Sequence, residues 1–278
     1  MRPKVAVMPP PLTLMCVHAH PDDEAISTGG ILARYAAEGV RTVLVTCTNG
    51  ELGDGPGGVK PGQPGHTEKE VAALRLEELE ASCSALGVSR LELLGYQDSG
   101  MMGWPQNDAP GAFWRVGLEE PARRLAGLME LHRPRVVVTY DENGFYGHPD
   151  HIQAHRVTVA AIERCGVPDK LYYPAVPASA IPRLAEALET RGVEVPEEIA
   201  DARFGTPDGK IGAIVDCSAF TAAKFASLAA HASQAENIFF LSLGEEVFGE
   251  VFSEEAFVRA RDRTGQTGVE DDLFRGLR

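Results

Sequence analysis

The sequence lacks a surplus of positive charge, which limits the partners that this protein can bind. Its 278 residues include 26 Lys and Arg against 40 Asp and Glu, a formal net charge of −14 at pH 7. Too few basic side chains are present to neutralise a phosphate backbone or an anionic lipid surface. We therefore expect neither nucleic acid nor a membrane as partner, and favour a small neutral molecule.

The sequence also lacks a paired set of cysteines and any long apolar run. Its five cysteines show no C-x-x-C spacing, and they predict a reducing, cytoplasmic location. Prolines at four positions interrupt residues 1–11, so we expect no signal peptide there. No later apolar run is long enough to span a bilayer.

What the chain does contain is an alternation of strand and helix patterns. The order predicts an α/β fold with a doubly wound, mostly parallel sheet and helices on both faces. We expect one catalytic domain over 1–278, with a core at 12–173 and a C-terminal part at 174–278 that completes the fold and the substrate cleft. Expected strands are 12–17, 42–47, 91–94, 135–140, 170–173 and 211–215, and expected helices are 29–38, 67–86, 118–132 and 219–232.

Two details of this pattern concern the second βα unit. The Gly- and Pro-rich stretch 49–65 reads as a long mobile loop and a plausible lid. The following helix is expected to begin with a capping box formed by Thr67 and Glu70. Its buried stripe is predicted to contain Ala72, Leu76, Leu79, Cys83 and Leu86.

Two clusters of ionisable residues each follow an apolar strand. The run 18–24, His-Ala-His-Pro-Asp-Asp-Glu, comes after the first strand, and 148–151, His-Pro-Asp-His, comes after Val136–Val138 through a Gly-rich turn. In doubly wound sheets, ligands bind beyond the carboxyl ends of the strands. The two clusters therefore predict one shared site.

The chemistry of the two clusters is that of a metal hydrolase. A hydrolytic Zn²⁺ takes three protein ligands and leaves a position for water. His20 and Asp23 can point to one centre while Asp22 points elsewhere, and His151 would complete the set. His155, four residues further along the predicted helix, is the competing third ligand.

The remaining residues of the clusters can supply proton transfer and orientation. Asp22 is a candidate general base for the metal-bound water, and a protonated His148 could stabilise an oxyanion or give a proton to a leaving amine. Pro149 fits the first turn of a helix, with His148 at the cap and Asp150 orienting it or capping the helix. The other histidines, His18, His66, His132 and His231, are expected to be structural or solvated.

These residues resemble the paired signature of the LmbE-like zinc deacetylases, also called the PIG-L family. The resemblance rests on 18–24 together with Tyr-Asp-Glu-Asn-Gly-Phe-Tyr-Gly-His-Pro-Asp-His at 140–151. It implies a Rossmann-like fold and hydrolysis of N-acetyl groups from glucosamine-containing substrates. It also implies zinc bound by His20, Asp23 and His151, Asp22 as base, His148 as oxyanion stabiliser or acid, and Tyr146 as a mobile residue near the oxyanion.

Further similarity points to the mycothiol-pathway branch of that family, which includes N-acetylglucosaminyl-inositol deacetylases and mycothiol S-conjugate amidases. It implies that Arg75 and Asp98 contact sugar or inositol hydroxyls, although a helix-surface Arg and a turn-forming Asp are the alternatives. Ser27 stands where the amidases tend to carry a Lys, which favours a deacetylase. By contrast, Asp-Glu-Asn at 141–143 looks more like the amidases, and Phe145 replaces a Gly that is usual in both groups.

The expected activity is thus removal of acetyl from an N-acetylglucosaminyl compound of the inositol type. The alternatives are an S-conjugate amidase or a non-catalytic sugar-binding module, the latter disfavoured because no G-x-G-x-x-G loop follows the first strand. Iron in place of zinc, and the oligomeric state, are left open.

Overall fold

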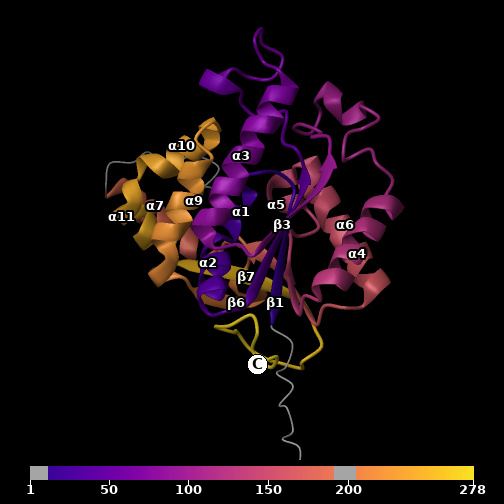
Figure 1. Ribbon diagram of the computed structural model, residues 1–278. Helices are drawn as coiled ribbons and strands as arrows, with labels where there is room; N and C mark the ends of the chain where they lie inside the picture. The colour runs from indigo at the N-terminus through magenta and orange to yellow at the C-terminus, as the bar shows by residue number, and fades with distance from the viewer. Residues whose placement is uncertain (1–11, 191–204) are drawn as a thin grey trace, which may run out of the picture.

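A seven-stranded sheet forms the centre of the computed structural model, which describes residues 12–190 and 205–278 (Figure 1). The strand order is β3-β2-β1-β4-β5-β7-β6. The strands are β1 (Thr13–His18), β2 (Arg41–Thr48), β3 (Arg90–Tyr96), β4 (Val136–Val138), β5 (Lys170–Ala175), β6 (Ile211–Asp216) and β7 (Glu254–Asp262).

The first five strands of the chain form the parallel part of this sheet. β1 pairs in parallel with both β2 and β4, and all six of its residues are buried. A strand covered on both faces needs apolar residues throughout, which explains its continuous hydrophobic run. β7 pairs antiparallel with β5 and β6, so the sheet is mostly parallel, as predicted.

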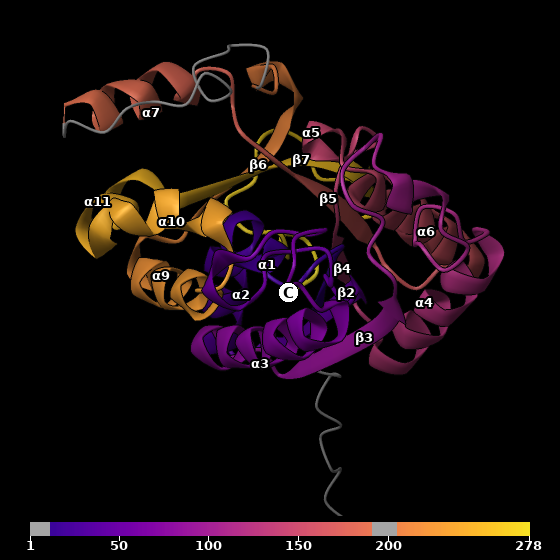
Figure 2. The ribbon, with the colours of Figure 1, turned by 90° about the horizontal axis from the view of Figure 1, so that it is seen from above.

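Helices cover both faces of the sheet, which confirms the predicted layers (Figure 2). One apolar core lies between the sheet and α2 and α3, and a second lies between the sheet and α4 and α6. The helices are α1 (Asp23–Ser27), α2 (Gly29–Ala37), α3 (Glu68–Leu86), α4 (Glu119–His132), α5 (Gly144–Gly147), α6 (Pro149–Cys165), α7 (Ala180–Glu189), α9 (Thr221–Ala230), α10 (Ala235–Ser242) and α11 (Gly244–Val251). Short 3₁₀ turns are η1 (Pro56–Gly58), η2 (Pro105–Asp108), η4 (Asp208–Lys210) and η5 (Ser218–Phe220).

The strand order places a topological switch point between β1 and β4. From β1 the chain moves outward to β2 and β3, and then returns to β4 on the other side of β1. At this reversal of order the connections leave in opposite directions, which opens a space beyond the carboxyl ends of the two strands. The two ionisable clusters follow these two strands.

The C-terminal part contains the main element that the sequence pattern missed. β7 was not predicted, because its charged residues hide an alternation in which Glu255 and Phe257 are buried. β4 is also shorter than the predicted 135–140. β6 and β7 join the same sheet as β1–β5. The single catalytic domain, its division at 173/174 and the role of the C-terminal part in completing the fold and the substrate cleft stay predictions.

Helix α3 presents a different face to the interior from the one predicted. Leu79, Cys83 and Leu86 are buried, whereas Ala72 and Leu76 are only partly covered. The buried face also includes Val71, Arg75, Glu78 and Ser82. Thr67 is the N-cap residue, but its side chain makes no capping hydrogen bond, so the predicted capping box is wrong.

The predicted lid divides into two unlike halves. Gly50, Glu51, Leu52 and Asp54 are buried against the rest of the molecule, whereas most of 56–65 is exposed. Only the second half has the exposure that a lid would need.

Among the described residues, no helix combines the length and apolar character needed to cross a membrane.

Candidate active site

The structure brings the three predicted metal ligands together beyond the carboxyl ends of β1 and β4. The Asp23 carboxylate stands between the two imidazoles, with Oδ2 3.4 Å from His20 Nδ1 and Oδ1 3.3 Å from His151 Nε2. The rings of His20 and His151 have centroids 5.3 Å apart. The side chains of His20, Asp23 and His151 are 8%, 14% and 2% exposed, so their donor atoms are shielded from bulk solvent.

The donor set fits a bound metal ion. Neither ring nitrogen of His151 makes a hydrogen bond within 12–190 and 205–278, although the side chain is buried. Among those residues, Nε2 has only the 3.3 Å contact with the Asp23 carboxylate, and a buried polar atom without a hydrogen bond is costly and calls for a further partner. Ligand atoms of His20, His148 and His151 lie within 4.8 Å of one another, as do those of His20, Asp98 and Asp150. Nitrogen and carboxylate donors of this kind suit Zn²⁺ and also Fe²⁺.

His155, the competing ligand, is engaged elsewhere. Its Nδ1 is 2.9 Å from the backbone oxygen of Tyr140, and its ring makes an edge contact with Tyr173. That hydrogen bond leaves Nε2 unprotonated, but among the described residues His155 belongs to no group of possible ligands that could hold one metal ion, whereas His151 does. The geometry therefore favours His151 over His155.

The two aspartates of the first motif have opposite electrostatic environments. Burial raises the pKa of Asp22 to about 6, although Arg75 opposes this effect. Burial would also raise the pKa of Asp23, but His151 and His20 outweigh it and hold that pKa well below its ordinary value. Asp23 is thus an anion suited to bind a cation, and Asp22 a carboxylate suited to exchange a proton.

The backbone of Asp22 is held in a conformation that L residues rarely adopt. Its φ is 111° and its ψ −28°. Such strain costs on the order of 1–3 kcal/mol and persists only where the surroundings fix it. The strained turn separates the Asp22 side chain from that of Asp23, as the sequence predicted, and directs it to Arg75, with Oδ2 3.0 Å from Nη2.

Arg75 is a buried part of the site and not a helix-surface residue. It is 4 % exposed, and its guanidinium donates to the backbone oxygens of Gly50 and Pro21 as well as to Asp22. These contacts fasten the loop after β2 to the first motif. The structure gives Arg75 a role in shaping the site, and a contact with substrate hydroxyls stays a prediction.

His148 is the N-cap residue of α6, as predicted from Pro149. The positive charge that the sequence led us to expect on its ring disagrees with the geometry. Its Nδ1 accepts a hydrogen bond from the backbone N–H of Asp150 at 3.1 Å. Burial lowers the pKa of His148 to about 2, and the neighbouring imidazoles act in the same direction. The neutral ring with Nδ1 as acceptor carries its proton on Nε2, and so presents an N–H donor rather than a cation.

Asp150 orients His20 and not His148. Its fully buried carboxylate lies with Oδ2 3.2 Å from His20 Nε2, while only its backbone N–H contacts His148. Ser99 holds the carboxylate in place, donating its N–H to Oδ2 at 2.9 Å and its hydroxyl to Oδ1. A carboxylate that accepts from the outer nitrogen of a ligating histidine fixes the ring and raises its basicity.

Asp98 lies on the opposite side of His20 from Asp23. Its Oδ1 is 3.7 Å from His20 Nε2 and accepts the backbone N–H of Gly100 at 2.8 Å. The turn-forming interpretation is therefore supported, and a sugar contact stays a prediction.

Glu51, which sequence reasoning left without a role, is also buried, and its Oε2 has no hydrogen-bond partner in the described ranges.

Tyr140 is a further site residue that sequence reasoning missed. Its ring stacks on His151, and its hydroxyl accepts the backbone N–H of Ala19 at 2.9 Å. His18 Nδ1 lies 3.3 Å from the same hydroxyl, and its Nε2 is 2.8 Å from Thr28 Oγ1. The signal was present in the sequence, because Tyr140 opens the second motif, but its contacts across β1 and β4 arise only in the fold.

Tyr146 lies at the rim of the site on α5. Its ring centroid is 5.0 Å from that of His151 and 6.2 Å from that of His148, and half of the residue is exposed. The preceding Phe145 has φ 65° and ψ −71°, close to the strained γ-turn region. Gly adopts such a conformation without strain, which agrees with the Gly that the resemblance implies at this position.

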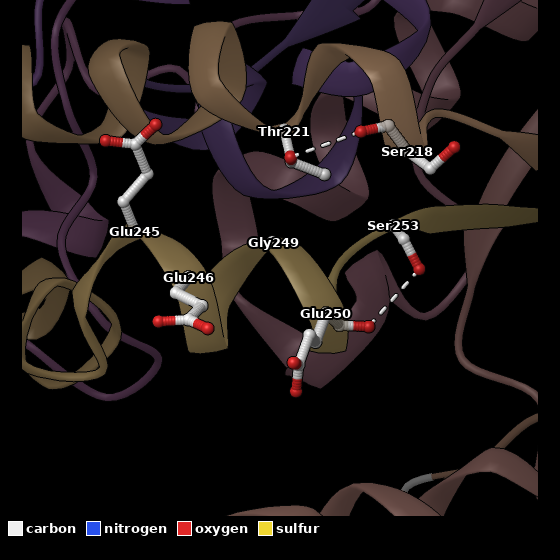
Figure 3. Close-up of a pocket in the computed structure, with 7 residues that line it drawn as sticks. All are labelled: Ser218, Thr221, Glu245, Glu246, Gly249, Glu250 and Ser253. Carbon is white, nitrogen blue, oxygen red and sulfur yellow. Dashed lines mark hydrogen bonds between the residues drawn. The ribbon is translucent and has the colours of Figure 1, made fainter.

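A hollow in another part of the structure carries no such chemistry. It has a volume of about 640 Å³ and is lined by residues of η5, α9 and α11 and by Ser253, two residues after α11 ends (Figure 3). Its polar groups include Glu245, Glu246 and Glu250, and the hydroxyls of Thr221 and Ser253 donate to nearby backbone oxygens. No histidine or cysteine lines it.

Comparison with known proteins gives matches along most of the chain. The family model described as PIG-L, GlcNAc-PI de-N-acetylase, matches residues 15–162. A relative from Acidothermus cellulolyticus, named 1D-myo-inositol 2-acetamido-2-deoxy-alpha-D-glucopyranoside deacetylase, is 43% identical over 277 residues, covering 95% of each chain.

Solved structures share the fold at lower identity. An N,N'-diacetylchitobiose deacetylase from Pyrococcus horikoshii, complexed with an inhibitor, aligns with a TM-score of 0.57 at 20% identity, over 90% of this chain and 84% of that one. A 4-carboxy-2-hydroxymuconate hydratase from Pseudomonas putida aligns with a TM-score of 0.60, also at 20% identity, over 92% and 99%. Since a deacetylase and a hydratase share this fold, the reaction has to be argued from the site.

Proposed function

Because this chain belongs to the PIG-L family of GlcNAc-PI de-N-acetylases, we propose that it is a metal-dependent N-deacetylase acting on an N-acetylglucosaminyl-inositol compound. The products would be acetate and the free 2-amino sugar. A relative named for that activity is 43% identical to this chain, and the alignment covers 95% of both. The observation that carries the proposal is the Asp23 carboxylate between His20 and His151, with Asp22 turned aside next to it.

The metal in this proposal is zinc, held by His20, Asp23 and His151. A bound zinc ion would polarise the amide carbonyl and lower the pKa of a water molecule to near 7. The chain's own groups then set its position: Asp150 orients His20, and Tyr140 packs on His151. Iron suits the same donors and is distinguished by metal analysis.

Proton transfer falls to Asp22 and His148. Asp22 takes the proton from the attacking water, since its raised pKa matches a base that works near neutral pH. The Nε2–H of His148 donates to the oxyanion that develops on the amide carbonyl, which is the point of greatest charge in the transition state. Tyr146, at the rim, is placed to add a second donor.

The leaving amine also needs a proton before the C–N bond breaks. Asp22, once it has accepted the proton of water, holds one that it can return to the amine nitrogen. His148, whose ring is neutral in this geometry, donates a hydrogen bond from Nε2–H but keeps its proton. The carbonyl carbon gains the water oxygen, and the amine leaves with the C–N electron pair and the proton from Asp22.

The direct test uses metal-loaded protein and N-acetylglucosaminyl-inositol. Acetate and primary amine should appear in equal amounts, stop with a chelator and return when zinc is added back. A thiol S-conjugate offered in competition tests the amidase alternative. Preferential cleavage of that conjugate would replace the deacetylase, and saturable sugar binding without acetate release would indicate a non-catalytic module.

A further inference from the structure

The turn between α9 and α10, residues 231–234, contacts three segments that build the active site. His231 Nε2 lies 2.7 Å from Glu24 Oε1, directly after the two aspartates of the first motif. Ser233 donates its N–H and hydroxyl to Glu78 on α3, at 2.9 and 2.8 Å. Gln234 bonds to the backbone N–H and oxygen of Asp54 in the loop after β2.

Glu24 connects this turn to Asp22. Its Oε2 accepts the backbone N–H of Asp22 at 3.0 Å, while its Oε1 faces His231. Ser82 of α3 donates to the same Oε1, and its hydroxyl lies 2.7 Å from that of Ser227 on α9. Glu24, Ser82, Ser227 and His231 are all fully buried.

A buried polar network of this kind is an expensive way to fill a core. An apolar replacement of the same shape is often neutral or stabilising, so stability alone does not account for it. The network ends on the backbone N–H of a residue with φ 111°. That conformation needs surroundings that over-determine it, and Glu24 is the acceptor that holds this N–H.

We propose that Glu24 and His231 are positioning residues that hold Asp22 in its left-handed conformation and so aim its carboxylate for catalysis. His231 fixes Glu24, and Glu24 fixes the Asp22 amide. The C-terminal part of the chain then contributes to the reaction without touching the substrate. This inference rests on the proposed role of Asp22 as the base.

The test compares two replacements of His231. His231→Leu removes the donor at similar volume, whereas His231→Gln keeps an N–H at similar reach. We expect kcat to fall about 10- to 100-fold in the Leu variant, because a misplacement of about 1 Å costs up to 10²-fold. KM and bound metal should be unchanged, and the Gln variant should recover most of kcat.

His132 provides the matched control. It is also buried, and its Nε2 lies 2.9 Å from Glu92 Oε1, at the C-terminal end of α4. His132→Leu should lower the melting temperature but leave kcat unchanged. If His231→Leu keeps wild-type kcat at full metal content, or if the Gln variant is no better than the Leu variant, the positioning role is wrong.

Two further measurements keep the test decisive. Should His231→Leu fail to fold, Ser82→Ala removes the second donor to Glu24 Oε1; a fall in kcat at constant KM supports the inference, and wild-type kcat overturns it. A crystal structure of whichever variant folds reports φ of Asp22 independently of activity. If the wild type releases no acetate, the proposed function fails, but the structure of the variant still tests the positioning role. A φ of Asp22 that moves away from 111° in the variant supports that role, and an unchanged φ overturns it.

Discussion

The phenol ring of Tyr140 lies face to face with the imidazole of His151, with ring centroids 4.1 Å apart and planes inclined by 16°. Stacking fixes the plane of a proposed metal ligand whose two nitrogens have no hydrogen-bond partner in the described residues. The Tyr140 hydroxyl at the same time accepts the backbone N–H of Ala19. One side chain thus ties the second motif to the first.

Replacing Tyr140 separates these two contributions. Tyr140→Phe keeps the stacking but leaves the Ala19 N–H unpaired, and should cost about 1–3 kcal/mol of unfolding free energy with metal affinity retained. Tyr140→Leu loses the stacking and should weaken metal binding about 10-fold or more. Denaturant unfolding and competition with a metal indicator measure the two effects. Equal metal affinity in both variants would contradict the orienting role.

Replacing Asp22 tests the general base. Asp22→Asn keeps the size of the side chain but cannot accept the proton of water, so kcat should fall about 10²- to 10⁴-fold. Metal content should stay at the wild-type level, because Asp23 and the histidines remain. Acetate release and metal analysis on the same sample decide the matter, and near-normal turnover would remove Asp22 from this role.

The metal ligands are tested against a matched histidine on the same helix. His151→Ala and His20→Ala should abolish stoichiometric metal binding, since three ligands are the minimum for a catalytic zinc site. His155→Ala, four residues beyond His151, should retain the metal, because His155 belongs to no group of possible metal ligands among the described residues. Metal retained in the His151 variant but lost in the His155 variant would reverse the assignment.

His148 combines a capping role with a proposed catalytic one, and two variants divide them. His148→Ala should lose about 1 kcal/mol of stability from the start of α6 and about 10²- to 10³-fold in kcat. His148→Asn can still accept the Asp150 N–H, as a good N-cap, but cannot extend a donor as far as Nε2. It should therefore recover the melting temperature without the activity. Recovery of both would show that His148 acts only as a cap.

The strain at Phe145 predicts a stabilising substitution. Phe145→Gly should raise the free energy of unfolding by about 1 kcal/mol, because Gly adopts φ near 65° without a Cβ clash. Phe145→Ala is the control, since it removes the ring but keeps the Cβ. Both are measured by denaturant unfolding. An Ala variant as stable as the Gly variant would trace the effect to the ring and not to the backbone.

The sequence patterns were sufficient to predict the parallel part of the sheet and the meeting of the two ionisable clusters beyond β1 and β4, because both depend on local signals. The apolar runs of β1 and β4 and the polar residues after them are visible in the chain itself. β7 was missed because Glu254, Arg259 and Arg261 interrupt its alternation, and its pairing with β5 and β6 supplies what the local pattern lacks.

The finer roles in the site depend on contacts that no local pattern contains. Asp150 was expected to orient His148, its near neighbour, but its carboxylate reaches His20, 130 residues away in sequence. Arg75 has the appearance of a surface residue on α3 and is buried because Gly50, Pro21 and Asp22 surround its guanidinium. Such pairings follow from the packing of α3 against the first motif.

The position of β4 beside β1 also has a consequence for how the protein matures. Ala19 and Tyr140, which meet across these strands, are 121 residues apart, and His231 is 207 residues from Glu24. During synthesis from the N-terminus, the first motif therefore leaves the ribosome long before its partners exist, and contacts of such separation form slowly. Metal capture at full affinity should be among the last events of folding, and a chain that stops before β4 should carry the first motif without retaining an ion.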